Sequence, residues 1–132
     1  MEQQKLNLWG FVLFPISIIL LLSTVWLGIL YALVSLPLKM SFKALIKRWN
    51  QYLFVLAVSI DQFGNVVLQD LFNDLLITKK ATHRFGHEDE TISSVLGKNK
   101  TTNTLSKPGK ILASFLDWID PNHVLNSIEH HC

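Results

Sequence analysis

Hydrophobic residues fill the first third of the chain almost without interruption. From Leu6 to Leu38 there is no Asp, Glu, Lys, Arg or His. Apolar side chains would point in every direction around a helix here, and a charge-free apolar run longer than about 18 residues is typical of a transmembrane helix. Pro15 and Pro37 predict a kink and the helix end. The pattern predicts a transmembrane anchor over residues 1–37.

A cleaved secretory signal peptide is the alternative interpretation of the same run. Its apolar core would cover only about 7 to 15 residues, behind a basic start and before a cleavage site with small residues. The chain begins Met-Glu-Gln-Gln-Lys, and no convincing cleavage site precedes Pro37. The sequence therefore favours an anchor that stays attached.

Basic residues predict the orientation of this anchor. Lys5 precedes the apolar run, whereas Lys39, Lys43, Lys47 and Arg48 follow it. The cytoplasmic flank of a membrane helix carries the excess of Lys and Arg. We expect the N-terminus outside and the C-terminal part in the cytoplasm.

The middle region, residues 38–78, has two different patterns. Over 38–51, lysines recur at every fourth position and apolar residues occupy another side of the same helical wheel. A basic helix of this kind is typical of the lipid interface, although it could instead pack on the protein's own core. The candidate membrane-surface residues are Lys39, Lys43, Lys47, Arg48 and Trp49.

Residues 52–77 predict an amphipathic helix. Polar side chains gather on one side of it, and the candidate polar face consists of Asp61, Gln62, Asn65 and Gln69. The helix could lie on or beside the membrane, or it could cross the membrane with its polar face toward a partner or an aqueous path. A second crossing would place the basic residues Lys79, Lys80 and Arg84 outside, so a single span is favoured.

The tail, residues 79–132, predicts short helices. An acidic start and Gly97 suggest a helix over 88–97, and the polar stretch 98–107 predicts a mobile loop. An apolar stripe at helical spacing runs over 111–119 and ends at Asp120 and Pro121, before a last short helix over 124–128. The predicted fold class is therefore all-α.

One group of acids and histidines could carry chemistry. Carboxylates and imidazoles can hold a divalent metal or activate water. The chain lacks HExxH and paired CxxC spacings, and Ser93 and Ser94 lack a GxSxG context, so capping and turn roles are favoured. We expect no catalytic residue, cofactor or metal, and no enzyme. The group consists of His87, Glu88, Asp89, Glu90, Asp117, Asp120 and His123.

Charge and cysteine content exclude further classes. The net charge is +2, and the basic residues are spread along the chain, so a nucleic-acid partner is not expected. Cys132 is the only cysteine, which makes an intramolecular disulfide impossible and fits a reducing compartment.

Four stretches resemble a group of small uncharacterised membrane proteins encoded by tailed bacteriophages and prophages. They are residues 59–66, 89–94, 116–123 and 127–129, among which Asp-Glu-Thr-Ile-Ser-Ser is the most specific. The chain departs from the group at Val95, where a basic residue is expected, and at Val124, where a cysteine is expected. The resemblance implies a phage or prophage origin and a bacterial inner membrane.

Three functional hypotheses follow from these patterns. The first is a membrane-anchored interaction or adaptor protein, whose partners are the lipid bilayer and a protein or a second copy in the membrane. The second is a holin-like pore in which 52–77 forms a second, polar-faced span. The third is a membrane-anchored metal-dependent hydrolase that uses the acids and histidines of the tail.

Overall fold

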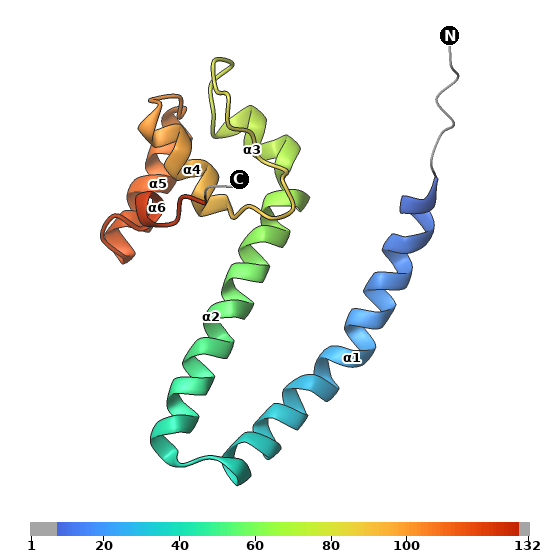
Figure 1. Ribbon diagram of the computed structural model, residues 1–132. Helices are drawn as coiled ribbons and strands as arrows, with labels where there is room; N and C mark the ends of the chain where they lie inside the picture. Colours follow the sequence, from blue (N-terminus) through green and yellow to red (C-terminus); the bar gives the residue numbers. More distant parts are fainter. Residues whose placement is uncertain (1–7, 130–132) are drawn as a thin grey trace. The chain divides into compact units, whose positions relative to one another are not determined.

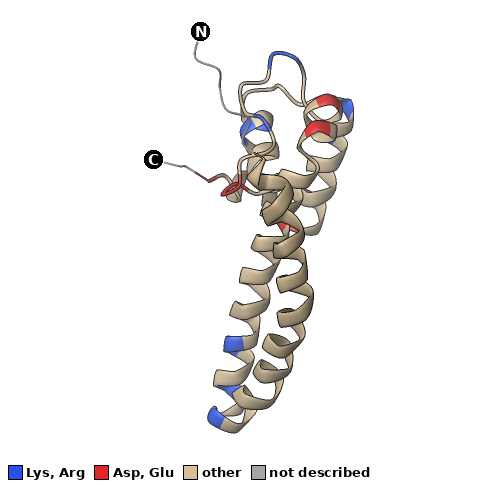
Figure 2. Cartoon of the chain, turned by 90° about the vertical axis from the view of Figure 1, so that its right-hand side faces the viewer, with Lys and Arg blue, Asp and Glu red and all other residues tan. Residues whose placement is uncertain are grey.

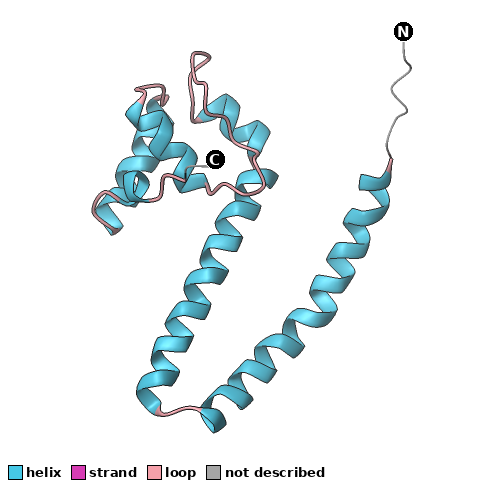
Figure 3. Ribbon diagram, viewed as in Figure 1, coloured by secondary structure: helices cyan, strands magenta, loops and turns pink. Residues whose placement is uncertain are grey.

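The computed structural model describes residues 8–129, and these residues form helices joined by loops (Figures 1 and 3). The prediction of an all-α fold is confirmed, since the described residues contain no strand beyond one isolated bridge between Ile77 and Leu105. Lys5, the start of the apolar run at Leu6 and the terminal Cys132 lie outside the described residues. The helices are α1 (Trp9–Lys39), α2 (Phe42–Val67), α3 (Gln69–Leu75), α4 (Ile92–Thr101), α5 (Lys107–Ile119) and α6 (His123–Asn126).

The first helix, α1, has the properties predicted for a membrane anchor. It is 31 residues long, none of its residues is buried, and its one charged side chain is Lys39 in the last turn (Figure 2). At 1.5 Å per residue it is about 46 Å long, more than the roughly 30 Å of a hydrocarbon core. In the part of the chain that the structure describes, α1 is the one continuous helix long and apolar enough to cross a membrane.

Polar groups inside α1 are bonded within the helix itself. The hydroxyls of Ser17, Ser23 and Thr24 donate to backbone carbonyls three or four residues earlier. Such bonds remove the cost of placing a hydroxyl in lipid. Pro37 does not end the helix as predicted, because α1 continues to Lys39.

The middle region does not divide where the sequence suggested. α2 runs without a break from Phe42 to Val67, so the predicted segments 38–51 and 52–77 are not separate helices. Lys39 belongs to α1, whereas Lys43 and Lys47 belong to α2. The real break lies at Leu68, where α3 turns by 75° from α2.

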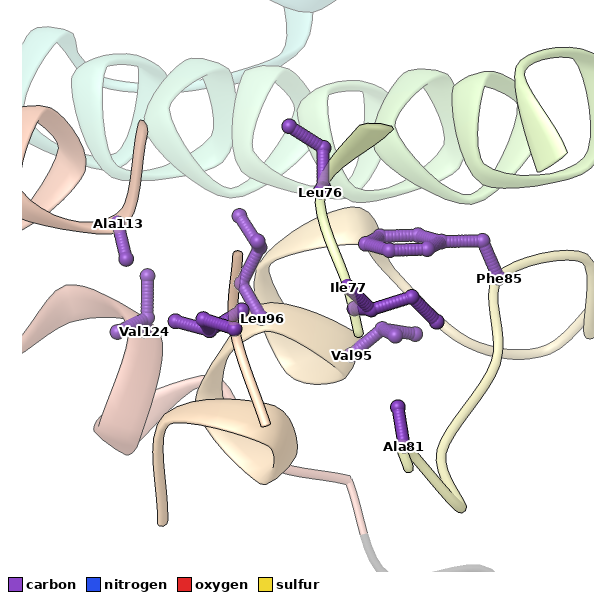
Figure 4. Close-up of a cluster of buried hydrophobic side chains, with 9 residues drawn as sticks. Leu76, Ile77, Ala81, Phe85, Val95, Leu96, Ala113 and Val124 are labelled. Carbon is purple, nitrogen blue, oxygen red and sulfur yellow. The ribbon is translucent and has the colours of Figure 1, made fainter. Parts of the chain in front are cut away.

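The chain divides into two compact units, one up to Asn50 and one from Gln51. The second, called here the helical domain, contains a hydrophobic core made by helices and loops (Figure 4). Phe85 comes from the loop after α3 and packs edge-on against Phe72, with ring centroids 5.3 Å apart. The buried apolar residues are Leu76, Ile77, Ala81, Phe85, Val95, Leu96, Leu105, Ala113 and Val124.

Capping residues determine where the helices of this domain begin. Thr91 caps α4 by accepting a hydrogen bond from the Ser94 backbone, and Ser106 caps α5 by accepting one from Gly109. Each cap satisfies a backbone N–H that has no partner inside its helix. α4 therefore begins after the acids of 88–90, later than predicted, and α6 begins at His123, one residue earlier than predicted.

The prediction that α4 stops at Gly97 is wrong, because this helix continues to Thr101. Asn99 is fully buried, and its side chain donates to the carbonyls of His83 and Val95. Gly97 is needed for packing instead, since a Cβ there would collide with the carbonyl oxygen of Val124 on α6. The predicted loop over 98–107 is thereby reduced to residues 102–106.

Candidate functional site

The helical domain contains a cavity of about 520 Å³ with one apolar and one polar side. The second half of α2 supplies the apolar side, and α4, α6 and the following residues supply most of the polar side. The lining residues are Phe54, Ala57, Val58, Asp61, Thr91, Ser93, His123, Asn126, Ser127, Ile128 and Glu129.

A chain of hydrogen bonds runs along the polar side of this cavity. The Ser93 hydroxyl lies 3.1 Å from Oδ2 of Asp61 and 3.3 Å from Nε2 of His123. On the other side of the imidazole, Nδ1 of His123 lies 3.0 Å from Oδ2 of Asp120. Two carboxylates, from α2 and from the end of α5, are thus connected through Ser93 of α4 and His123 of α6.

Local structure explains why these side chains meet. Ser93 lies in the first turn of α4, where helix N–H groups favour a nearby carboxylate such as that of Asp61. Asp120 caps the end of α5, and its carbonyl accepts the His123 backbone N–H at 2.9 Å. This four-residue turn holds the Asp120 carboxylate beside the imidazole. Ser93 is 6% exposed, whereas the side chain of His123 is 35% exposed, so the histidine is the more accessible.

The predicted polar face of α2 makes hydrogen bonds inside the helical domain. Asn65 is fully buried, and its side chain donates to the carbonyls of His87 and Glu90 and accepts the Gly86 N–H. Gln62 donates to the carbonyl of Asp89. Three of the four predicted residues therefore bind the segment 86–93: Asp61, Gln62 and Asn65.

Gln69, the fourth residue of that face, lies against the backbone of Gly86. Gly86 has a φ of 119°, and a Cβ there would collide with the Gln69 side chain. On α3, Asn73 makes two hydrogen bonds with the backbone of Phe85. The connector after α3 is therefore bound to α2 and α3 by side-chain amides.

Glu90, another acid of the tail, has partners inside the helical domain. Glu90 pairs with Lys98 at 2.5 Å and accepts the Ser94 hydroxyl at 2.8 Å. Among the described residues, no group of three or more His, Cys, Asp or Glu side chains could hold a metal. The structure does not bring His87, Glu88 and Asp89 together with Asp117, Asp120 and His123 in such a group.

Within residues 8–129, Asp117 has a clearly lowered pKa. It pairs with Lys100 at 2.5 Å and accepts the backbone N–H of Val124 at 3.1 Å. The hydrogen bond from Lys100 is the main reason why the pKa of Asp117 is lowered, opposed by burial and aided by Val124. The carboxylate thus stays charged and joins α4, α5 and α6. Because its folded pKa is lowered, this stabilisation is present above the ordinary carboxyl pKa and is lost as the pH falls through the folded value.

The candidate membrane-surface residues lie near the junction of α1 and α2. Lys39 is exposed, with its ammonium 5.6 Å from the ring centre of Tyr31. Lys43, Lys47 and Arg48 are exposed in the first turns of α2, and Trp49 is partly buried.

Ser93 was not a sequence candidate, because its neighbours lack the GxSxG context. The spacing of Asp120 and His123 was the one available signal, since two residues between an acid and a histidine can bring both to one side of a turn. No sequence signal joined this pair to Ser93, thirty positions earlier.

No protein-family model matches the sequence, and the searches of curated proteins and solved structures also found no match. The chain is an all-helical protein with one candidate membrane span. Residues 59–66, 89–94, 116–123 and 127–129 each contribute lining residues to the cavity.

Proposed function

We propose that this protein is a small integral protein of a bacterial inner membrane, of phage or prophage origin, that acts as a membrane-anchored adaptor. The observation that carries the proposal is α1, whose side chains are exposed all round although nearly all of them are apolar. Such a helix has lipid as its natural solvent. The helical domain would be the part that meets another protein.

The charges flanking α1 support one orientation. Lys39 is the last residue of α1, and Lys43, Lys47 and Arg48 lie in the first two turns of α2. Their excess over the N-terminal side favours a cytoplasmic location for the helical domain, with the N-terminus outside. The same residues would bind anionic headgroups at the inner leaflet.

The contacts of α2 favour one membrane span over a pore with two spans. From Asp61 onward, the polar side of α2 binds residues 86–93 of the same chain, which argues against a lumen-facing role for this part of the helix. The uncharged part of α2 between Arg48 and Asp61 covers about 18 Å at 1.5 Å per residue. A hydrocarbon core of about 30 Å needs a longer segment.

An exposed apolar face on α5 supports the adaptor role. Ile111 and Trp118 are 71% and 78% exposed, and the ring of Phe115 stacks on that of Trp118 at a centroid distance of 6.2 Å. Contiguous exposed apolar side chains, particularly aromatic ones, are typical of surfaces that bind a partner.

Site-specific photo-crosslinking tests the adaptor function. A photo-reactive amino acid at Phe115, incorporated into the full chain in bacterial membranes, is expected to yield a discrete crosslinked product. The matched control is Lys110 on the same helix, which is exposed but is not one of the apolar side chains of this face and should yield none. A product of twice the chain mass would identify the partner as a second copy. Equal absence of products at both positions would contradict the adaptor proposal.

A further inference from the structure

The contacts of His123 match the arrangement of a nucleophile, a base and an orienting acid. In a serine triad, the hydroxyl contacts one imidazole nitrogen and a carboxylate contacts the other, whatever the order along the chain. Here Ser93 Oγ lies 3.3 Å from Nε2, and Asp120 Oδ2 lies 3.0 Å from Nδ1. Hydroxyl-to-base distances of this length are common before substrate binds.

The Ser93 hydroxyl lies within hydrogen-bond distance of two acceptors, the Asp61 carboxylate and the His123 imidazole. It donates to Asp61 at 3.1 Å in one arrangement, and it can donate to Nε2 of His123 in the other. A hydroxyl has one proton, so it can serve only one acceptor at a time. In the second arrangement Nδ1 carries a proton and donates to Asp120, which is the tautomer that a general base requires.

The cavity beside Ser93 combines apolar lining residues with a hydrogen-bond donor, as the binding site of an ester substrate requires. Phe54, Ala57 and Val58 form an apolar wall, and the exposed Phe54 makes this wall accessible from outside. Asn126 lines the same cavity and carries a carboxamide that can donate to a developing oxyanion. A substrate carbonyl oxygen that accepts a hydrogen bond from Asn126 and avoids the Asp61 carboxylate would be stabilised as negative charge develops on it.

We propose that Ser93, His123 and Asp120 form a nucleophilic site that cleaves carboxylic esters with an apolar acyl group. Ser93 Oγ forms a bond to the carbonyl carbon while its proton passes to Nε2 of His123. The carbon–oxygen bond to the alcohol then breaks, and His123 returns the proton to the leaving oxygen. Water attacks the acyl-serine with His123 as base, which releases the carboxylic acid and restores the Ser93 hydroxyl. Asp120 keeps the imidazole oriented throughout.

Covalent labelling tests this proposal directly. The full chain in detergent micelles is treated with an alkyl fluorophosphonate, which forms an oxygen–phosphorus bond to an activated serine as fluoride leaves. We expect mass spectrometry to place the adduct on Ser93. This result needs no variant, so it does not depend on whether a Ser93 substitution folds. No adduct, or an adduct confined to another serine, would overturn the proposal.

Two variants and a control show whether His123 or Asp61 accepts the proton of Ser93. His123→Gln should slow labelling by about 100-fold or more, within the range that a general base contributes. Asp61→Asn should speed labelling, because it removes a competing acceptor and a negative charge near the oxyanion. Ser114→Ala on the exposed side of α5 is the control and should label like the parent chain. Labelling that survives His123→Gln, or that is lost in Asp61→Asn, would overturn the assignment.

Discussion

Replacing Asn65 with alanine is expected to release the connector after α3 and to destabilise the helical domain by about 3 kcal/mol or more, because each buried group left without a partner costs about 1–3 kcal/mol. The Asn65 side chain is fully buried and makes hydrogen bonds of 2.7 to 3.1 Å to the backbone of Gly86, His87 and Glu90. Domains are typically stable by only about 5–15 kcal/mol, so this loss would be a large fraction.

Hydrogen exchange measures this effect in the full chain without isolating a part of it. In the Asn65→Ala variant, amides of residues 85–91 should exchange much faster than in the parent chain. Asn50→Ala is the matched control, because Asn50 lies on the same helix and is exposed. Unchanged protection of residues 85–91 in Asn65→Ala would show that Asn65 does not hold the connector.

Replacing Gly97 with alanine is the second change with a large expected effect. In an ordinary helix interior, this substitution stabilises by roughly 0.5–1 kcal/mol because alanine is the better helix former. At Gly97 the same substitution should destabilise the domain, since the new Cβ would collide with the backbone of Val124 and the side chain of Ile128. Overpacking typically costs about 1–3 kcal/mol, and backbone atoms yield less easily than side chains.

Gly64→Ala is the matched control for this reversal. Gly64 is also helical, but its nearest atom to an added Cβ is the flexible tip of Ile92, 3.1 Å away. Urea unfolding of both variants in the same detergent should lower the midpoint for Gly97→Ala and leave it unchanged or raised for Gly64→Ala. A midpoint for Gly97→Ala at or above that of the parent chain would mean that α4 and α6 do not pack closely.

Periodicity and composition predicted the features that depend only on residues close together in the sequence. The long apolar N-terminal helix and the all-α class follow from local patterns that one helix can satisfy alone, and both are confirmed. The polar residues of α2 were also identified from local periodicity. Their partners were not, because Asn65 and Asp61 bind backbone and side chains more than twenty positions away.

The end of α4 was predicted wrongly because tertiary contacts determine it. Gly97 was interpreted as a helix stop, whereas it is small because another helix approaches it closely. The polar residues after it suggested a loop, whereas Asn99 is buried and bonded to the chain around it. Tertiary contacts therefore decided the end of α4. The chain formed by Ser93, His123 and Asp120 was missed for the same reason, since only the fold brings it together.

Reporter fusions test most directly the claim that one span anchors a helical domain on the cytoplasmic side. Reporters that distinguish cytoplasm from periplasm are placed after Asn50, in α2, and after Thr82, in the connector. Both fusions are expected to report the cytoplasm. A Thr82 fusion in the periplasm with an Asn50 fusion in the cytoplasm would mean that α2 crosses the membrane, which would contradict the single-span account and favour a pore.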